Sequence, residues 1–332
     1  MTERSTRFFE VDAIKAVGAL TVVLIHALRS PFEPGASAPE LWLGQLTRFA
    51  VPGFLAVSGF LYATGKPASW AETRSRLTRI AVPYLVFSLV AQILRHSQGR
   101  ALWGPGSGSL WLDFAAGASL GPYYYVFIAA LLVSATPLFS RLSRRAVTAL
   151  FALEVGAQAF FELAGGLPFF WHLRNPLLWA AWFHLGWLAR LHYPWLLEQA
   201  DRHRAVLVLG LTALVAAAGG HLASGPDPAG RRIVEWLAIY PILAVLFFAS
   251  CGAQAPRWLA RPVRTLSDAS YTIYLVHPLL VVPLRQALRA TPFEFSPVVI
   301  GGVWGGAIFG ALLLILAGQW TLGARSRRWL GA

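Results

Sequence analysis

The sequence contains few charged residues and almost no cysteine. Only 13% of its 332 residues are charged, whereas a soluble domain carries about 25%. The single cysteine, Cys251, excludes an internal disulfide framework, and no cluster of cysteine and histidine has the spacing of a zinc site. We therefore expect neither disulfides nor a bound metal, and a fold that is held together by helix packing.

Apolar stretches fill much of the chain, which is 56% hydrophobic. A helix of roughly 17 to 25 apolar residues is long enough to cross a bilayer. The predicted spans lie at about 9–28, 44–64, 80–97, 122–140, 146–162, 176–193, 205–222, 236–252, 268–288 and 298–322. The longest connections, near Arg29 to Leu43 and Ser97 to Gly121, are loops rich in glycine, proline and serine rather than folded modules. The sequence thus predicts an all-α membrane protein, a polytopic bundle of about ten transmembrane helices forming one membrane domain over residues 1–332.

The net charge of +13 fits a membrane topology better than a nucleic-acid partner. Nucleic-acid binding needs a basic face on a soluble fold, whereas here the basic residues lie between apolar runs. About two thirds of the 28 lysines and arginines fall in the set of loops that includes both termini. Cytoplasmic loops are enriched in these residues, so both termini are predicted to be cytoplasmic. We expect a multi-pass protein of the inner (plasma) membrane, with an uncleaved first span.

The first predicted span carries a polar stripe. Asp12 and Lys15 are three residues apart, which predicts an ion pair on one helix face. His26 follows Lys15 by eleven residues, about 20° around the helix and about 16 Å along it. A charged residue at membrane depth costs roughly 2.5 to 3.5 kcal/mol. Spacing alone leaves two readings: three residues anchored at the interfaces, or a functional stripe in which Lys15 and His26 have separate roles.

A second polar position lies in the ninth predicted span. His277 directly precedes Pro278, which has no backbone N–H and leaves the carbonyl of Tyr274 without its helical partner. Ser270, Tyr274 and His277 share a helix face. His277 is then either an oxyanion donor or acceptor-orienting group, or a structural histidine that helps satisfy the interrupted helix.

Four motifs occur in order along the chain. They are Lys15-x10-His26, the segment FLAVSGFLY from Phe54 to Tyr62, Arg76-Leu-Thr-Arg79 followed by Pro83-Tyr84, and Ser270-Tyr-Thr-Ile-Tyr-Leu-Val-His277. Together they resemble the motifs of the family 3 integral-membrane acyltransferases. The chain departs from that pattern at Lys15, where arginine is common, and at Gly121-Pro122-Tyr123, where many relatives have a Trp-Phe pair.

The resemblance implies an O-acetyltransferase-like enzyme. Its expected donor substrate is acetyl-CoA or another acyl-CoA, and its expected acceptor is a hydroxyl of a saccharide or glycolipid at the lipid bilayer. A histidine suits the task of taking the hydroxyl proton near neutral pH. His26 is the expected base, with Asp12, Lys15 and His277 as further catalytic candidates. Arg76 and Arg79, with Arg74 as a weaker candidate, are expected to bind the CoA phosphates beside the positive end of their helix.

Two other functions fit the same pattern less well. A polar stripe among many spans is also typical of a saccharide or lipid transporter or flippase, and a membrane scaffold or sensor is a third possibility. A transporter has no need of a CoA phosphate site. Among the remaining polar residues, Glu154 lies inside a predicted span without an identifiable partner. His184 is expected to be structural and to lie near a span end. Gly53 and Gly59 predict close helix approach.

Overall fold

The computed structural model describes residues 7–28, 37–99, 103, 107–164, 167–223, 228–252, 255–288 and 296–331. Every regular element in these ranges is a helix, as predicted. The longer helices are α1 (Phe9–Ala27), α2 (Ala38–Thr47), α3 (Ala50–Tyr62), α4 (Trp70–Gln98), α7 (Tyr124–Ser134), α9 (Arg144–Ala164), α11 (Ala180–Leu191), α12 (Tyr193–Ala223), α13 (Pro228–Leu237), α14 (Ile239–Ser250), α15 (Arg257–Leu288) and α16 (Pro297–Leu322). Shorter pieces are α6 (Leu110–Ala115), α8 (Thr136–Phe139), α10 (Phe169–Arg174), α17 (Ser326–Trp329) and the 3-10 turns η1 (Gly121–Tyr123), η2 (Pro176–Leu178) and η3 (Gly323–Arg325).

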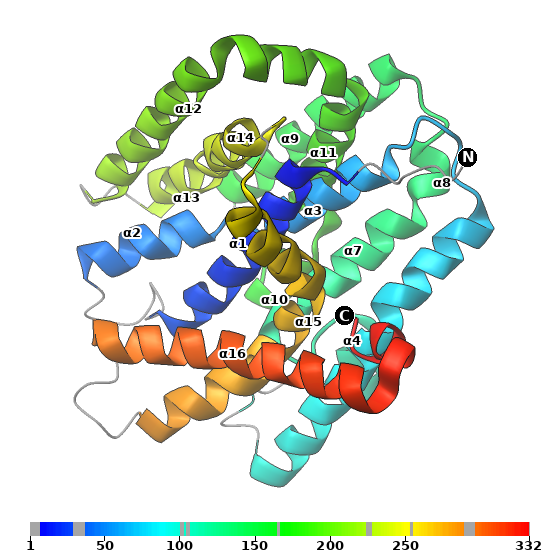
Figure 1. Ribbon diagram of the computed structural model, residues 1–332, viewed down its shortest axis with the longest axis vertical. Coiled ribbons are helices and arrows are strands. Elements are labelled where there is room, and N and C mark those ends of the chain that lie inside the picture. Colours follow the sequence, from blue (N-terminus) through cyan, green and yellow to red (C-terminus); the bar gives the residue numbers. More distant parts are fainter. Residues whose placement is uncertain are drawn as a thin grey trace.

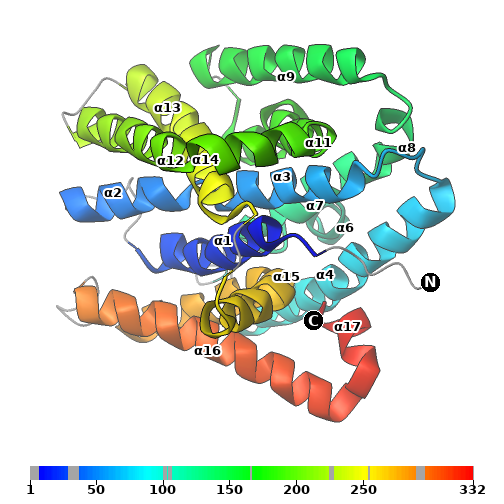
Figure 2. The same ribbon diagram turned by 45° about the horizontal axis from the view of Figure 1, so that its top comes forward.

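Helix α1, the helix with the polar stripe, lies at the centre of the molecule. It contacts α15 on one side and α3 on the other, and also α14 and α16. Beyond these, α16 packs on α15, and α11 and then α9 pack on α3. Figure 2 shows the resulting order of layers, α9, α11, α3, α1, α15 and α16. The central position explains why a helix with three charged residues can exist here: its neighbours, rather than lipid, surround its polar groups.

Two glycines set the spacing between α3 and α11. A Cβ atom added at Gly59 would lie 1.8 Å from the carbonyl oxygen of Phe183, and one at Gly186 would lie 1.7 Å from that of Ala56. The two backbones are therefore too close for any larger residue. At Gly53 a Cβ would come within 3.2 Å of the Ile14 and Leu243 side chains. Close approach was predicted for Gly53 and Gly59, and Gly186 is the partner that the sequence did not reveal.

Large apolar side chains cover the outside of the bundle. They include Leu89 and Ile93 on α4, Leu153 and Phe160 on α9, Val206 and Leu209 on α12, and Phe309 and Leu316 on α16. An outward apolar surface of this kind suits a bilayer, whose core offers no water to polar groups. The protein is an all-α membrane protein.

Five helical stretches of the described chain are long and apolar enough to cross a membrane. They are Trp70–Gln98, Arg144–Ala164, Tyr193–Leu222, Gly230–Ser250 and Pro297–Trp329. The segment Gly121–Ser134 is a shorter apolar helix. Other predicted spans fall on helices that are shorter, such as α11, or that carry more charge, such as α1. The total of ten spans and the cytoplasmic side of the termini stay predictions.

Several helices begin well before the predicted spans. Helix α4 starts at Trp70 rather than near Ile80, because Ser69 and Glu72 form a capping box there. Helix α15 starts at Arg257 rather than near Asp268. Hydropathy marks the part of a helix that suits lipid, whereas backbone hydrogen bonds continue until a cap ends them. Both helices therefore extend beyond their apolar segments.

Candidate functional site

His26 and His277 lie side by side, although 251 positions separate them in the sequence. Their ring centroids are 5.1 Å apart and the rings are inclined by 31°. His26 occupies the last turn of α1, and His277 lies within α15, which packs along α1. His26 is exposed, whereas His277 is fully buried. Two of the four sequence motifs therefore converge on one place.

The proline after His277 determines the hydrogen bonding of its ring. Nδ1 of His277 lies 2.7 Å from the carbonyl oxygen of Tyr274 and 3.3 Å from that of Ile273. A carbonyl oxygen can only accept, so Nδ1 carries a hydrogen and donates it. This bond satisfies the carbonyl that Pro278 leaves without a helical partner. In the neutral ring Nε2 is then an acceptor; it is buried and has no hydrogen-bond partner among the described residues.

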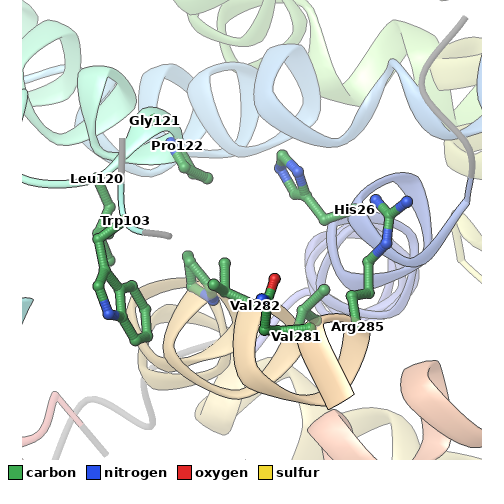
Figure 3. A pocket seen from close by; sticks show the side chains of 10 residues that line it. His26, Trp103, Leu120, Gly121, Pro122, Val281, Val282 and Arg285 are labelled. Atoms are coloured by element: carbon green, nitrogen blue, oxygen red, sulfur yellow. The ribbon is translucent and has the colours of Figure 1, made fainter. Parts of the chain in front are cut away.

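A cavity of about 300 Å³ opens beside His26. Its polar lining consists of His26, Arg285 and Gln286. The rest of the lining is mostly apolar and comprises Trp103, Leu120, Gly121, Pro122, Pro278, Val281 and Val282. Figure 3 shows His26 and Arg285 on one side of this space and Trp103 on the opposite side. The cavity can hold a small organic group next to the imidazole.

The wall of the cavity formed by residues 120–122 is connected to α15 by two hydrogen bonds. The Tyr274 hydroxyl donates to the carbonyl of Pro122, and the Tyr123 hydroxyl donates to the carbonyl of Leu275 at 2.6 Å. The same α15 segment that carries His277 therefore positions this wall. The structure thus connects the Tyr-rich start of the fourth predicted span to the two histidines.

Arg95 and Asp113 form a buried ion pair behind that wall, with Nη1 of Arg95 2.8 Å from Oδ2 of Asp113. Arg95 also donates to the carbonyl of Ser119, and Ser107 donates to the other carboxylate oxygen of Asp113 at 2.7 Å. Burial raises the pKa of Asp113, but the hydrogen bonds from Ser107 and Gln92 and the charge of Arg95 outweigh it and leave the pKa below its ordinary value. The carboxylate therefore stays charged and fixes the loop that ends at the cavity.

The sequence predicted an ion pair between Asp12 and Lys15, but in the structure Asp12 pairs with Arg7. Arg7 reaches it instead through two bonds, Nε to Oδ2 at 2.6 Å and Nη2 to Oδ1 at 3.0 Å, and the Ser267 hydroxyl donates to Oδ1 at 2.7 Å. Hydrogen bonding to Asp12, and then to Asp268, raises the pKa of Arg7. The arginine fork fits a carboxylate better than an ammonium group does, and Arg7 lies just outside the predicted span, where span-based reasoning did not look for it.

Lys15 is half-buried and has no ion pair among the described residues. Along α1, Lys15 lies about 16 Å from His26, and Asp12 lies about 21 Å from His26. Neither residue can therefore contact His26. Asp12 connects the start of α1 to α15 through Ser267, whereas Lys15 brings a cation without a bound carboxylate to the middle of the bundle.

Arg76 and Arg190 lie at the other end of α1 and are held by aromatic rings. The Arg76 guanidinium lies 4.5 Å from the ring centroid of Tyr62, and Arg190 lies 4.5 Å from that of Phe8. Nη1 of Arg76 is buried without a hydrogen-bond partner among the described residues. Cation–π contacts hold a guanidinium in place while its N–H groups stay available. These residues are suited to binding an anionic group, and Arg190 had no signal in the sequence beyond its positive charge.

Arg79 and Arg74 are exposed on the same helix as Arg76. The prediction that the positive end of this helix assists the arginines in binding phosphate is wrong. Because α4 begins at Trp70, its first amides lie more than a turn before Arg76 and are occupied by the side chains of Ser69 and Glu72. The arginines must act through their own charge.

A second buried histidine lies on the far side of α3. Nδ1 of His184 is 2.8 Å from Oε2 of Glu154, and both residues are buried. His184 is fully enclosed within α11, rather than near a span end as expected, with the rings of Phe139 and Phe183 against it. Glu154 thus has a partner, and its separation in sequence explains why none could be named. The described residues contain no group of three or more metal-ligating side chains.

The sequence missed most of the cavity lining. Pro278, Val281, Val282 and Arg285 follow the i, i+3, i+4, i+7 spacing of one helix face. That spacing, which starts at Pro278 directly after His277, was a usable signal for Arg285. Trp103 had none, because it lies in a connection whose position only the folded chain determines.

A central polar helix carries one of two adjacent histidines in this helical membrane protein, and a cavity lies beside them. Residues 8–319, nearly the whole chain, match the acyltransferase domain of acyltransferase family 3. The chain belongs to that family and is a membrane acyltransferase, as the sequence motifs indicate. A search of the curated proteins and a search of the solved structures each found no match.

Proposed function

We propose that this protein is an O-acyltransferase of the inner membrane that moves an acyl group, acetyl in the simplest case, from cytosolic acyl-CoA to a hydroxyl of a saccharide or glycolipid. The observation that supports this most is the cavity of about 300 Å³ beside His26, with His277 5.1 Å away. An acyltransferase of this kind needs a base next to a space for two substrates.

His26 is the general base in this proposal. It takes the proton of the acceptor hydroxyl as the oxygen attacks the thioester carbonyl. The tetrahedral intermediate then collapses, the carbon–sulfur bond breaks, and the proton on His26 goes to the departing CoA sulfur. An acyl-histidine intermediate is not required, because both substrates can meet beside the same imidazole. The mostly apolar wall of the cavity offers few polar groups that could hold a water molecule beside the thioester, which favours transfer over hydrolysis.

His277 is assigned to the acceptor side. With Nδ1 donating to the Tyr274 carbonyl, the neutral ring has a lone pair on Nε2 and no hydrogen to offer an oxyanion. Such a nitrogen can accept a hydrogen bond from a substrate hydroxyl. Of the two functional roles that the sequence left open, orientation of the acceptor is therefore the better supported.

The donor is proposed to bind at the opposite end of α1, through Arg76 and Arg79 with Arg74 in a minor role. Helix α1 has 19 residues and is about 28 Å long, so the CoA phosphates and the thioester must lie far apart. The thin pantetheine arm of CoA can bridge that distance between helices, and Lys15 lies along the way. This arrangement would bring a cytosolic donor to an acceptor at the His26 end.

Turnover and donor binding can be measured separately with purified protein in nanodiscs. The readouts are release of free CoA thiol, with candidate glycans supplied, and binding of a non-hydrolysable acyl-CoA analogue. We expect His26→Ala to lose turnover and keep analogue binding. Arg76→Ala/Arg79→Ala should lose analogue affinity, by about tenfold or more if two charged hydrogen bonds are removed.

The matched control is Arg257→Gln, an exposed arginine in the first turn of α15. It should leave both readouts unchanged. If the wild type binds no acyl-CoA, or if His26→Ala turns over at the wild-type rate, this mechanism is wrong, and movement of a saccharide or lipid without acyl consumption becomes the function to test.

A further inference from the structure

The cavity beside His26 is larger than an acetyl group requires. Its volume is about 300 Å³ and its wall is mostly apolar. An apolar cavity of about 150 Å³ is enough to hold a molecule of benzene. The space next to the imidazole therefore has room for several carbons beyond those of acetyl, in surroundings that favour hydrocarbon over water.

Trp103 forms the side of the cavity opposite His26. Figure 3 shows its indole across the space from the imidazole. Two hydrogen bonds fix the residue: its Nε1 donates to Oε1 of Gln98 at 2.9 Å, and its carbonyl accepts from Nη2 of Arg95 at 3.5 Å. Because the indole N–H is bonded to Gln98, the ring presents its carbon atoms to a ligand.

Leu120 and Val281 form further parts of the wall and belong to the core of the bundle. Both side chains are buried, one directly before η1 and the other on α15. The hydrogen bonds of Tyr123 and Tyr274 connect these two segments. The lining is thus a fixed hydrocarbon surface, which binds an alkyl chain through buried apolar area rather than through polar contacts.

The acyl chain of the donor is the substrate group that this surface is placed to bind. The chain begins at the carbon that the acceptor hydroxyl attacks, so it starts beside the base whichever acceptor is used. The lipid of a glycolipid acceptor is separated from the attacking hydroxyl by at least part of a sugar. Of the two hydrocarbon chains, the acyl chain is therefore the one that must lie near His26.

We infer that the cavity binds an acyl chain longer than acetyl, of about four to eight carbons by comparison with benzene in half this volume, and that Trp103 limits its length. The inference rests on the proposed function in placing the thioester beside His26. It adds the class of donor, a short- to medium-chain acyl-CoA.

A chain-length series tests this inference. The ligands are 2-oxoalkyl thioethers of CoA that correspond to acetyl, butyryl, hexanoyl, octanoyl and decanoyl, which keep the carbonyl and cannot transfer. Binding would be measured in nanodiscs by microscale thermophoresis, with empty nanodiscs to correct for partition into the bilayer. Thiol release would be measured in parallel with the corresponding acyl-CoA thioesters and candidate glycans.

The variants change the cavity in opposite directions. Trp103→Ala and Trp103→Phe lengthen the space, and Val282→Phe fills part of it. Trp187→Ala is the matched control, because Trp187 is 4% exposed against 5% for Trp103 and packs on Phe139 on the far side of α3. Thermal unfolding would verify that each variant is folded.

We expect wild-type affinity to rise about fourfold for each added methylene, the usual effect of burying one CH₂, up to an optimum between butyryl and octanoyl. Trp103→Ala should lengthen the optimal chain by about two to four carbons, since loss of an indole leaves a space on the order of a benzene ring. Trp103→Phe should lengthen it less, Val282→Phe should shorten it, and Trp187→Ala should leave it unchanged.

The inference is overturned if the wild type binds acetyl best, if it binds all lengths alike, or if Trp103→Ala has the same optimum as Trp187→Ala. A loss in Trp103→Ala by one factor at every length would give Trp103 a structural role only. If Trp103→Ala does not fold, Val282→Phe decides, since an unchanged optimum there also overturns the inference.

Alkyl glycosides, from methyl to octyl, test the other hydrocarbon chain. A Trp103-dependent optimum in their length, with none among the acyl-CoA analogues, would assign the wall to the lipid of the acceptor and overturn the inference. Failure of the proposed function looks different. Chain-length selection that depends on Trp103, without thiol release for any acyl-CoA, would leave the chain site standing and remove the acyl transfer.

Discussion

His277 and His184 are two buried histidines with similar hydrogen bonding and different neighbours. His277 and His184 are both fully buried within helices, each donates or shares a hydrogen at Nδ1, and each has an Nε2 without a hydrogen-bond partner among the described residues. The ring of His184, however, lies among Phe139 and Phe183. That of His277 lies beside His26, which lines the cavity.

The comparison shows what a polar residue inside a membrane bundle does and does not indicate. Burial requires that such a residue find a partner, and both histidines have found one, a carboxylate for His184 and a backbone carbonyl for His277. A partner alone therefore does not identify chemistry. What separates the two is their neighbours: His277 lies against His26, which lines the cavity, whereas His184 lies against aromatic rings.

The largest expected effect comes from removing one histidine ring on each side of α3. His26→Ala should lower kcat by roughly 10²- to 10⁴-fold, the usual contribution of a general base. His184→Ala should leave kcat per folded molecule unchanged, because His184 is enclosed by aromatic rings. Thiol release would be normalised to the folded fraction from size-exclusion chromatography. A loss of kcat in folded His184→Ala would mean that the two sites are not distinct.

The second prediction concerns stability at the Glu154 and His184 pair. Glu154→Leu removes the partner of a buried ring nitrogen, which we expect to cost about 1 to 3 kcal/mol of unfolding free energy. The double variant Glu154→Leu/His184→Leu should recover much of that loss, since replacing both partners leaves no unpaired polar group. Unfolding in mixed micelles measures both, with thiol release as the second readout.

Two results would contradict this prediction, one in the activity of the variants and one in their stability. If folded Glu154→Leu transfers acyl groups more slowly and the double variant does not recover, the pair takes part in function. Equal stability of the single and double variants would show that the ring of His184 does not depend on Glu154.

The smallest expected effect concerns His277, whose hydrogen bond to the Tyr274 carbonyl can be tested separately from its proposed role in orienting the acceptor. Asparagine at this position can still donate to the Tyr274 carbonyl but offers no ring nitrogen beside His26. His277→Asn should therefore keep near wild-type stability and lower kcat about tenfold, or about 1.4 kcal/mol. His277→Ala should lose both. The pair of variants would be compared by thermal unfolding and by steady-state thiol release with the best acceptor.

A His277→Asn protein with full activity would assign His277 entirely to satisfying the helix interrupted by Pro278. In that case the acceptor-orienting role is wrong, and the difference between His277 and His184 reduces to their position in the bundle.

The sequence predicted the helical class and the family because both depend on local patterns. Apolar runs identify helices that suit lipid, and the four motifs are read within single segments. The pairing of Asp12 with Lys15 was wrong for the same reason: i, i+3 spacing permits a contact, but it cannot rank it against Arg7 and Ser267, which reach the carboxylate from outside the span and from α15.

By itself, then, the sequence determined that this is a helical membrane acyltransferase and which histidines carry its motifs. Only the tertiary structure decided that His26 and His277 adjoin, that Glu154 belongs to His184, and that Arg285 and Trp103 share a cavity with His26. The physical reason is the same in each case. Helix formation follows from hydrogen bonds and hydropathy along the chain, whereas these contacts follow from how helices far apart in the sequence pack against one another.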